Sequence, residues 1–408
     1  MREMKDSGVE WIGEIPKNWK ICRLKDYAHI CNGRDYSEVL DENGDYPVIG
    51  SGGQFAKACE PLYQKESVLL GRKGTIDKPL FVDYPFWTVD TMYYTEIKEN
   101  VSAKYFYYLC TQIEFDFYQY GSAVPSMTQR DLYNVNFPYP TLDEQRRIAN
   151  YLDRKCSQID TIIAQQQEVI EKLKAYKLSV ITEAVTKGLN PDTPMKDSGV
   201  EWIGEIPEYW QLSHIGNLVE MGSGGTPDRK KPEYWENGNI PWMSSGEIND
   251  EYIYSTTEHI TELGLQNSNA KILPVNTVML GLIGQGKTKR LTAILKTEVC
   301  CNQNLAYLIA DEKYLHYRYL FYCFKAMYFY IRGLVGESQA GIYSYFLKKL
   351  HIPLPDIEQQ IRISDYLDTK CEAIKNSINK RERIIEKFTS YKRSLIYEVV
   401  TGKKEVQR

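Results

Sequence analysis

Two long stretches of the chain carry an apolar row with a residue at every seventh position. The first runs from Leu142 to Lys187 without a proline or glycine, and the second follows Pro355 in the other half of the chain. A row of this period, sustained over about five heptads, predicts a long helix with a coiled-coil seam. The predicted seam residues are Leu152, Ile159, Gln166 and Leu173 in the first helix and Leu367, Ile374, Arg381 and Phe388 in the second.

The boundaries and the pairing of these helices follow from the same pattern. Each stretch starts just after a proline, Pro140 or Pro355, and ends at a glycine, Gly188 or Gly402, which are usual start and stop signals. Because each helix has one apolar stripe, the two most simply pack on each other, antiparallel, about a pseudo-two-fold axis. At 1.5 Å per residue, roughly 45 residues form a rod of about 65–70 Å. The polar seam positions 166 and 381 correspond and fix the register.

The rest of the chain has the pattern of mixed α/β domains, at residues 17–140 and 208–355. Short β-rich runs such as YPVIG and SVLLG are separated by Gly and Pro turns, as in strands joined by tight connections. An aromatic-rich helix is expected in each domain, over 103–120 and 314–334. The sequence therefore predicts an α+β fold: two mixed α/β domains separated by two long antiparallel helices that form a coiled coil.

An internal repeat organises the chain into two tandem halves. MKDSGVEWIGEIP occurs at 4–16 and, letter for letter, at 195–207, an offset of 191 (195 minus 4). The segments 139–156 and 354–371 match at an offset of 215 (354 minus 139), and the strands SVLLG and TVMLG pair at 210 (277 minus 67). The second half therefore gains 19 residues (210 minus 191) before this strand and 5 (215 minus 210) after it. Constant ends and divergent middles favour a common scaffold carrying two different domains over general drift after duplication.

Composition excludes several classes of protein. Apolar residues make up 43% of the chain and charged residues 25%, which is typical of a soluble protein of two or three domains. The most apolar stretch contains Arg318 and Lys325, unlike a membrane span, and the N-terminus has no apolar signal region. The nine cysteines lack metal or disulfide spacing, so we expect a reduced, cytoplasmic setting. The net charge of −4 argues against a cationic nucleic-acid coat but allows a local basic footprint.

Polar loops fall at corresponding places in both halves, ahead of the long helices. Arg and Lys can bind guanine edges and Gln can pair with adenine, whereas Lys and backbone amides hold phosphates. One such loop alone is more often an ordinary surface turn, so the argument rests on their correspondence. The candidate DNA-binding residues are Gln54, Arg72, Lys73, Gln129 and Arg130 in the first half and Thr226, Lys230, Ser244, Gln285, Lys287, Lys289, Arg290 and Gln339 in the second.

One segment resembles a nucleotide-binding motif. Residues 281–288 satisfy the phosphate-loop pattern GxxxxGK[ST], but a nucleotide site also needs a helix that opens at the Lys-Thr pair. The residues that follow, KRLTAILKTEV, favour a second strand, so we interpret the loop as a strand–loop–strand DNA contact. A nucleotide hydrolase using Lys287 is the weaker alternative. We find no amino-methyltransferase motif, GxGxxG after a strand, GxSxG or metal-spaced histidine cluster, and therefore predict no catalytic site and no metal site.

Four motifs together resemble a known family. They are SGVEWIGEIPxxW before each domain (7–19 and 198–210), Pro-x-x-x-x-Gln at the start of each long helix, YLDxKC (151–156 and 366–371) and GGTPxxxxPEYW (224–235). In this order, and duplicated, they are similar to the specificity (S, HsdS) subunits of Type I restriction-modification systems over essentially the whole chain. The second helix begins IEQQ where the first has LDEQ, a mild departure from the pattern.

The resemblance implies a function and an organisation. Residues 1–140 and 191–355 would be target-recognition domains that each read one half of a bipartite DNA sequence. Residues 141–190 and 356–408 would be the conserved helices, whose length sets the spacer. Two methyltransferase (M) subunits, with S-adenosylmethionine and adenine-N6 chemistry, and restriction (R) subunits, with ATP and Mg²⁺, would dock on a chain that binds no cofactor, enters no membrane and is not itself an enzyme. A coiled-coil adaptor that binds no DNA is the remaining alternative.

Overall fold

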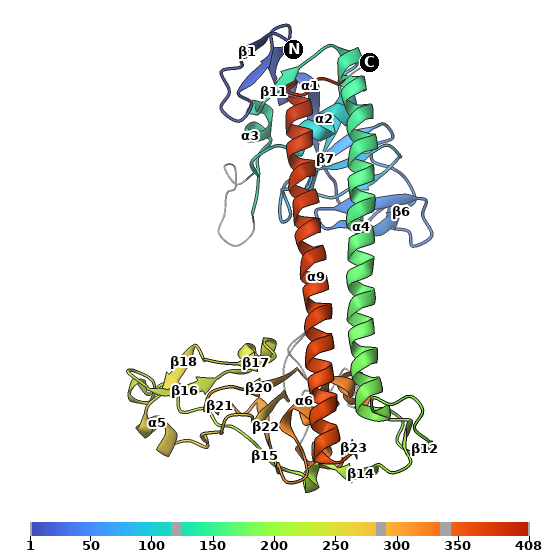
Figure 1. Cartoon of the computed structure of the whole chain (residues 1–408). Helices are drawn as coiled ribbons and strands as arrows, with labels where there is room; N and C mark the ends of the chain where they lie inside the picture. Colours follow the sequence, from blue (N-terminus) through green and yellow to red (C-terminus); the bar gives the residue numbers. More distant parts are fainter. Residues whose placement is uncertain (1, 116–124, 283–290, 335–343, 407–408) are drawn as a thin grey trace. The chain divides into compact units, whose positions relative to one another are not determined.

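The chain folds into two compact units, each of which contains parts of both long helices. The computed structural model describes residues 2–115, 125–282, 291–334 and 344–406. Unit 1 comprises Met1–Gln167 and Glu382–Arg408, and unit 2 comprises Glu168–Arg381. The long helices are α4 (Leu142–Lys187) and α9 (Ile357–Val400) (Figure 1).

The strands in the described part of unit 1 form four small sheets. Two are strand pairs, β1–β2 and β3–β11, and the others have the orders β4-β10-β7-β8 and β6-β5-β9, in which β5 and β9 are parallel. The strands are β1 (Met4–Asp6), β2 (Glu14–Pro16), β3 (Lys20–Arg23), β4 (Ala28–Asn32), β5 (Tyr46–Gly50), β6 (Gly53–Ala58), β7 (Ser67–Gly71), β8 (Leu80–Val82), β9 (Trp87–Thr88), β10 (Met92–Ile97) and β11 (Asn136–Tyr139). The short helices are α1 (Leu24–Tyr27), α2 (Ala103–Cys110) and α3 (Gln129–Asn134).

Unit 2 repeats this plan with additions. Its strand pairs are β12–β13 and β14–β23, and its larger sheets have the orders β15-β22-β19-β20-β17 and β18-β16-β21, with β16 and β21 parallel. The strands are β12 (Met195–Asp197), β13 (Glu205–Pro207), β14 (Gln211–His214), β15 (Val219–Ser223), β16 (Ile240–Met243), β17 (Tyr252–Ile253), β18 (Glu258–Ile260), β19 (Val278–Gly281), β20 (Thr292–Leu295), β21 (Cys300–Cys301), β22 (Leu305–Ala310) and β23 (His351–Leu354). The helices are α5 (Glu262–Gln266), α6 (Tyr317–Ala326), α7 (Tyr328–Leu334) and α8 (Ser344–Lys348), and the 3₁₀ turns are η2 (Ile215–Asn217), η3 (Pro232–Tyr234) and η4 (Ser245–Asn249).

The two predicted repeat strands occupy the same place in the two units. Both β7 and β19 are buried along their whole length, because apolar side chains point to both faces of an interior strand. Strand β7 pairs antiparallel with β8, the next strand in the sequence, and with β10. Strand β19 pairs in the same way with β20 and with β22. The apolar runs SVLLG and VMLG therefore form the centre of each domain.

The long helices have the boundaries that the sequence predicted. Each ends at a glycine with a left-handed backbone, Gly188 (φ +78°) and Gly402 (φ +77°), which satisfies terminal carbonyls without the strain of a side chain. The predicted helix over 103–120 begins as expected, but α2 ends at Cys110. Residues 116–120 of that prediction lie outside the described part of the chain. The second predicted aromatic helix is divided into α6 and α7 at residue 327.

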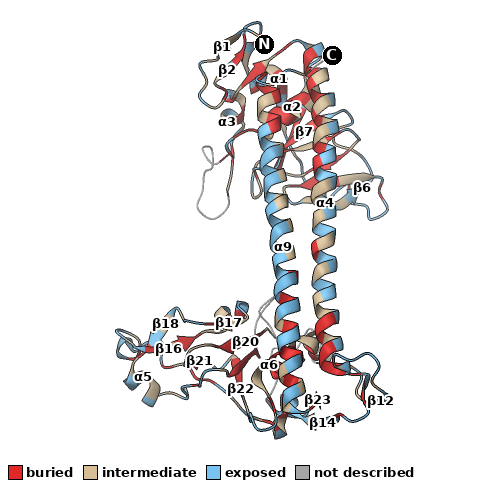
Figure 2. Cartoon of the chain, viewed as in Figure 1, coloured by how far each residue is buried: buried red, intermediate tan, exposed pale blue. Residues whose placement is uncertain are grey.

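Within each unit the two long helices run antiparallel. In unit 1 the core joins the beginning of α4, including Leu152 and Ile159, to the end of α9, including Leu395 and Val399. In unit 2 the core joins residues 180–185 of α4 to the beginning of α9, including Leu367. Buried positions gather toward the helix ends, whereas most residues between 160 and 179 and between 375 and 394 are partly or fully exposed (Figure 2). The structure therefore has the α+β fold with a helical pair that the sequence predicted.

Candidate nucleic-acid interface

A buried glutamine anchors each α/β domain to its long helix. The Oε1 atom of Gln145 accepts a hydrogen bond from the backbone N–H of Ser102 (3.0 Å), the N-cap of α2, and its Nε2 donates to the carbonyl of Pro140 (3.1 Å). Gln360 makes the same pair of bonds in unit 2, to the N–H of His316 and the carbonyl of Pro355, both at 2.8 Å. The Pro-x-x-x-x-Gln motif is thus a local clamp on backbone groups that would otherwise be buried without partners.

The aspartate of each YLDxKC element, on the long helix, accepts hydrogen bonds from side chains of the aromatic helix. Asp153 accepts from the Tyr108 hydroxyl (2.8 Å) and from Lys104 Nζ (2.6 Å). Asp368 accepts in the same way from Tyr322 (2.5 Å) and from a guanidinium nitrogen of Arg318 (2.7 Å). Burial, and then the carboxylate, raise the pKa of both tyrosines well above the ordinary value. Both hydroxyls therefore remain protonated donors to an ionised partner, which is a strong class of hydrogen bond.

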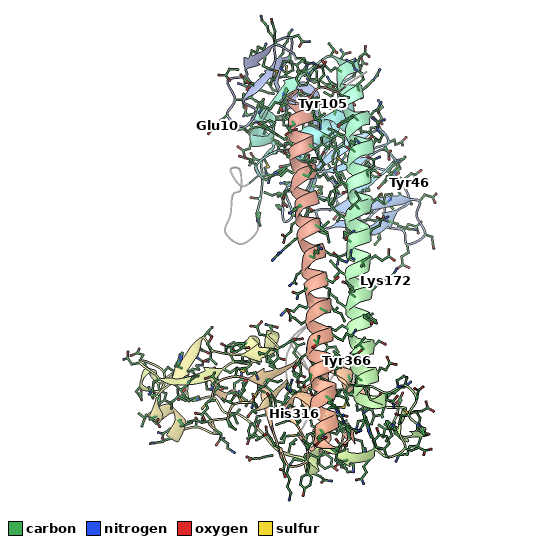
Figure 3. All side chains as sticks on the ribbon, in the orientation of Figure 1. Glu10, Tyr46, Tyr105, Lys172, His316 and Tyr366 are labelled. Atoms are coloured by element: carbon green, nitrogen blue, oxygen red, sulfur yellow. The ribbon has the colours of Figure 1, made fainter. Side chains whose placement is uncertain are left out.

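One tyrosine in each unit joins both long helices. Tyr105 is fully buried beside the end of α9 (Figure 3). Its hydroxyl oxygen lies 3.1 Å from the carbonyl oxygens of Pro138 and Val400. Tyr319 in unit 2 lies 3.0 Å from those of Pro353 and Val185. Each hydroxyl therefore links the strand that leads into one long helix to the last turn of the other.

The repeated N-terminal segment closes the same corner. The indole of Trp19 donates to Glu144 (2.9 Å), and that of Trp210 donates to Gln359 (3.1 Å). A Cβ atom on Gly402 would lie 2.9 Å from the Trp19 ring. The helix-ending glycine is therefore also required by the close approach of the repeated segment, and the two identical hairpins hold equivalent corners of the scaffold.

Three predicted loops of unit 1 come together around residues 90–91. The backbone N–H groups of Arg72 and Lys73 both donate to the carbonyl of Thr91, at 2.9 and 3.2 Å. The Ser51 side chain lies beside Gly74, whose Cβ would be 3.0 Å from the Ser51 hydroxyl. The third loop joins at Met127, whose N–H donates to the carbonyl of Arg72 (3.0 Å). Loops 50–54, 71–74 and 126–130 thus form one surface.

The predicted side chains on this surface differ in what holds them. The Gln129 amide donates to Asn32 Oδ1 (3.2 Å), and the Arg72 guanidinium lies 5.9 Å from the centroid of the Tyr93 ring. Lys73 is exposed and lies 3.8 Å from an oxygen of Asp90. Gln54 on β6 and Arg130 on α3 are also exposed. The surface therefore presents amide and cationic groups of the kind that base edges and phosphates accept.

Unit 2 also brings predicted residues together on one surface, beside β21. The hydroxyl of Thr226 donates to Gln303 Oε1 (2.6 Å). Ser244 follows β16, whose partner β21 is followed by Asn302, and the Asn302 N–H donates to the Met243 carbonyl (3.0 Å). Thr226, Ser244 and Gln303 therefore lie at one edge of the domain, and Lys230 is exposed on the neighbouring loop.

The loop 224–235 is held by a stacked arginine. The Arg229 guanidinium lies 3.7 Å from the ring of Trp235 and 4.8 Å from that of Trp242, and both its terminal nitrogens bind Glu258. The Glu258 hydrogen bond raises the pKa of Arg229 and lowers that of Glu258. Because Arg229 is neutralised by its own domain, it orders the GGTPxxxxPEYW loop. Lys230 and Lys231 are the other exposed cations there, and Lys231 donates to the Tyr234 hydroxyl.

Five predicted residues lie outside the described part of the chain: Gln285, Lys287, Lys289, Arg290 and Gln339. The described flanks of the motif at 281–288 are β19 and β20, which pair antiparallel, whereas a phosphate loop requires a strand followed by a helix. No set of three or more metal-ligating side chains occurs among the described residues. No described helix has the length and apolarity that crossing a bilayer requires.

Sequence reasoning missed Asn32, Gly33 and Gln303, and identified Gly224 only as part of the motif GGTPxxxxPEYW. A Cβ on Gly33 would lie 2.0 Å from the Val89 carbonyl oxygen, and one on Gly224 would lie 1.9 Å from that of Cys301. In both units a glycine after the first strand of the main sheet thus lets two loops touch through their backbones. The correspondence of Asn32-Gly33 and Ser223-Gly224 after aligned strands was the available signal.

These features define a class of protein: a duplicated scaffold in which two α/β domains are attached by identical anchors to an antiparallel helix pair. The chain belongs to the family of Type I restriction modification DNA specificity domains, whose model matches residues 16–172 and 207–386. The sequence-based prediction of this family is confirmed, and the chain is a specificity subunit rather than a catalytic subunit.

Individual relatives agree with this assignment. The chain is 25% identical to the Type I restriction enzyme MjaVIII specificity subunit of Methanocaldococcus jannaschii, over 96% of this chain and 94% of that protein. It is 28% identical to the EcoR124I/EcoR124II specificity subunit of Escherichia coli, over 70% of this chain and 76% of that protein. Its fold is similar (TM-score 0.71, 16% identity, 96% of this chain and 99% of the other) to a chain in a structure described as the basis of complex assembly and conformational transition of the type I R-M system.

Proposed function

We propose that each α/β domain reads one half of a bipartite DNA target. The carrying observation is that in each unit several predicted loops gather on one surface, and that the two surfaces carry different side chains. Unit 1 offers Arg72, Lys73 and Gln129, and unit 2 offers Thr226, Lys230 and Ser244. Different side chains select different bases, so the target is expected to be asymmetric. Residues 1–140 and 191–355 are proposed as the target-recognition domains.

The spacer between the half-sites is proposed to be set by the helix pair, residues 141–190 and 356–408. The support is that α4 and α9 are each continuous, over 46 and 44 residues, and that a helix is stiff on this length scale. Inserting one heptad at equivalent places in both helices adds about 10 Å, or roughly 3 base pairs at 3.4 Å each. The spacer should change by that amount while the half-sites remain the same. An unchanged spacer would refute the proposal that the length of the helices sets it.

Two methyltransferase subunits are proposed to dock on the scaffold, with restriction subunits completing a cytoplasmic complex that supplies the S-adenosylmethionine, ATP and Mg²⁺ chemistry. The support for two copies is the repeated hairpin. Lys5, Glu10 and Glu14 are exposed, Glu10 projecting from the hairpin in Figure 3, and are identical to Lys196, Glu201 and Glu205. Burial explains why the core positions of the two hairpins are identical, but it does not explain the identical exposed positions. Two copies of one partner, one on each hairpin, would explain the exposed positions as well.

The test is co-expression with the M subunit and mapping of N6-methyladenine at single-base resolution. A bipartite motif with a fixed gap is expected, and exchanging residues 17–140 for those of another specificity subunit should change one half-site only. Gln129→Ala should relax the choice of base at one position of that half-site, because an amide that pairs with a base edge contributes about 1–3 kcal/mol of discrimination. Exposed Glu99→Ala, just after β10 and at the end of that strand away from residues 90–91, is the control and should leave the motif intact. A continuous motif would sink the proposal.

A further inference from the structure

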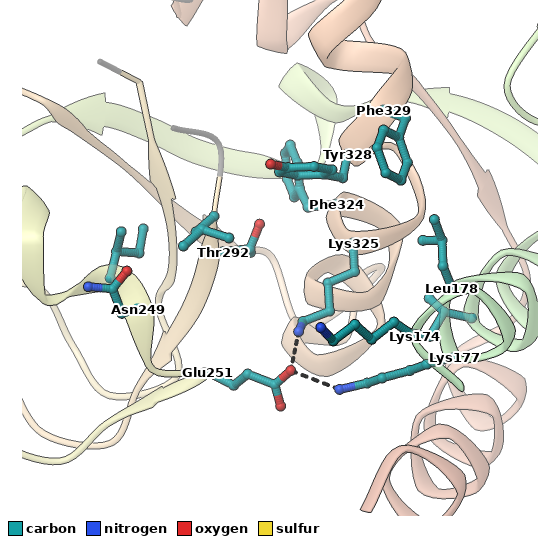
Figure 4. Close-up of a pocket in the computed structure, with 13 residues that line it drawn as sticks. Lys174, Lys177, Leu178, Asn249, Glu251, Thr292, Phe324, Lys325, Tyr328 and Phe329 are labelled. Atoms are coloured by element: carbon teal, nitrogen blue, oxygen red, sulfur yellow. Dashed lines mark hydrogen bonds and ion pairs between the residues drawn. The ribbon is translucent and has the colours of Figure 1, made fainter. Parts of the chain in front are cut away.

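A cavity of unit 2 carries more positive than negative charge. It has a volume of about 310 Å³ and is formed by α4, by α6 and α7, and by residues 248–251 ahead of β17 (Figure 4). Its charged lining residues are Lys174, Lys177, Lys325 and Glu251. Much of the remaining wall is apolar, including Leu178, Phe324 and Phe329.

Two ammonium groups in this cavity share one carboxylate oxygen. Lys177 Nζ lies 3.1 Å from Glu251 Oε1, and Lys325 Nζ contacts the same atom, as the dashed lines in Figure 4 show. The exposed fractions of the Lys177 and Lys325 side chains are only 22% and 21%. Lys174 has its own partner in Glu171 (2.9 Å). The Lys177–Glu251–Lys325 cluster therefore has an excess of one positive charge in a largely covered place, where charges are normally paired.

Glu251 supplies a single negative charge to the two lysines. Burial alone would raise the pKa of Glu251, but Lys325 and Lys177 outweigh it and hold the pKa to about 2. Glu251 is thus fully ionised at neutral pH and has no further charge to give. Burial lowers the pKa of Lys325, Glu251 opposes that effect, and Lys177 adds to it by repulsion. An added anion would act in the same direction as Glu251 and favour the charged form of Lys325.

The corresponding lysine of unit 1 is paired one to one. The counterpart of Lys177 is Lys392, whose Nζ lies 2.7 Å from both carboxylate oxygens of Asp160. The counterpart of Lys325, counted from the equivalent Tyr105 and Tyr319, is the uncharged Thr111. The cavity around Lys392 is also lined by Arg154 and Arg393, but the arrangement of two ammonium groups on one carboxylate oxygen is described in unit 2.

We propose that the unit 2 cavity binds a small organic anion, a carboxylate on an aromatic or aliphatic group. The carboxylate is placed between Lys177 and Lys325, and the apolar group lies against Phe324 and Phe329. The volume is at the small end for ligand sites and suits a single ring. Because the walls come from the scaffold helix α4 and from the 248–251 loop of the second α/β domain, the bound anion ties that domain to the scaffold and stabilises unit 2.

The test uses the full chain with benzoate as the probe, and calorimetric unfolding and titration as readouts. Benzoate should bind saturably and raise the Tm of unit 2 by about 3 °C or more near saturation. Acetate, which lacks the ring, and benzyl alcohol, which lacks the charge, should each bind at least tenfold more weakly. Equal binding of benzyl alcohol and benzoate would overturn the proposal, because the cluster would then contribute nothing.

Lys177→Met is the decisive variant. It removes the excess charge and leaves Lys325 and Glu251 paired one to one, so unit 2 should fold normally while benzoate binding weakens tenfold or more. Lys177→Arg should retain binding, and Lys392→Met, the matched change in unit 1, should not affect it. Benzoate affinity that is the same in Lys177→Met as in the parent chain, or lost equally in Lys392→Met, would refute the assignment.

Discussion

Gln360 is the position where one substitution should damage one unit selectively. Its side chain is fully buried, its Oε1 accepts from the His316 N–H (2.8 Å), and its Nε2 donates to the carbonyls of Tyr314 (3.0 Å) and Pro355 (2.8 Å). Leucine at this position would fill a similar volume but could make none of these bonds. Gln360→Leu therefore leaves three backbone groups without their partner, next to the start of α6 and of α9.

The magnitude follows from those three bonds. Each contributes about 1 kcal/mol net, and an unpaired buried group costs about 1–3 kcal/mol, so Gln360→Leu should destabilise unit 2 by about 3 kcal/mol or more. At about 2–4 °C per kcal/mol for a unit of this size, the Tm of unit 2 should fall by roughly 6–12 °C. Gln145→Leu removes two bonds in unit 1 and should lower the Tm of that unit by roughly two thirds as much.

The assay is calorimetry combined with hydrogen exchange read by mass spectrometry, so that peptides of the two units are followed separately. Glu358→Ala, an exposed position on the same turn of α9, is the control and should shift Tm by less than about 1 °C, as most surface changes do. A shift of that small size for Gln360→Leu, or equal loss of protection in both units, would show that the motif does not act as a local anchor.

Three further predictions test other parts of the molecule. Burial and then the neighbouring His214 lower the pKa of His351 in the folded state. The stability of unit 2 should therefore be greatest above the unfolded pKa of about 6.5 and decline as the pH falls through the folded pKa. Denaturant unfolding from pH 8 to 5 should show this dependence, and His351→Gln should reduce it. Gly33→Ala would place a Cβ 2.0 Å from the Val89 carbonyl oxygen and should destabilise unit 1 by about 3 kcal/mol, whereas Gly52→Ala, with open space around it, should be nearly neutral in the same melt. Lys230→Ala should weaken DNA binding by the assembled complex about equally on all sequences and reduce the salt slope by about one; a change in preferred sequence would contradict a phosphate contact.

The scaffold could be predicted from the sequence because its signals are periodic or duplicated. The heptad row and the flanking Pro and Gly fixed the bounds of α4 and α9, since a long amphipathic helix is determined mainly by its own period. The matching runs SVLLG and TVMLG identified β7 and β19 as equivalent strands. The first aromatic helix was predicted to continue past Cys110, because Ile113 and Phe115 are apolar like the helix but are buried by contacts from distant parts of unit 1.

The candidate surfaces could be predicted only as separate loops. That loops 50–54, 71–74 and 126–130 share one surface depends on long-range contacts, such as those of Ser51 with Thr91 and of Met127 with Arg72, which have no local signal. The unbalanced cluster of unit 2 is a second case, since Lys177, Glu251 and Lys325 lie far apart in the chain. Gly33 and Gly224 look like ordinary turn glycines until the carbonyl against each of them is known.

The way in which the domains are attached explains how the same scaffold can carry two different ones. Gln145 and Gln360 bind backbone groups at the start of the aromatic helix, and Tyr105 and Tyr319 bind backbone carbonyls of the scaffold. Backbone groups are chemically the same whatever side chains surround them, so these anchors constrain only where the aromatic helix begins. The 24 additional residues of the second domain (19 plus 5) are therefore accommodated between fixed anchors, and loop chemistry can vary without a matching change in the helices.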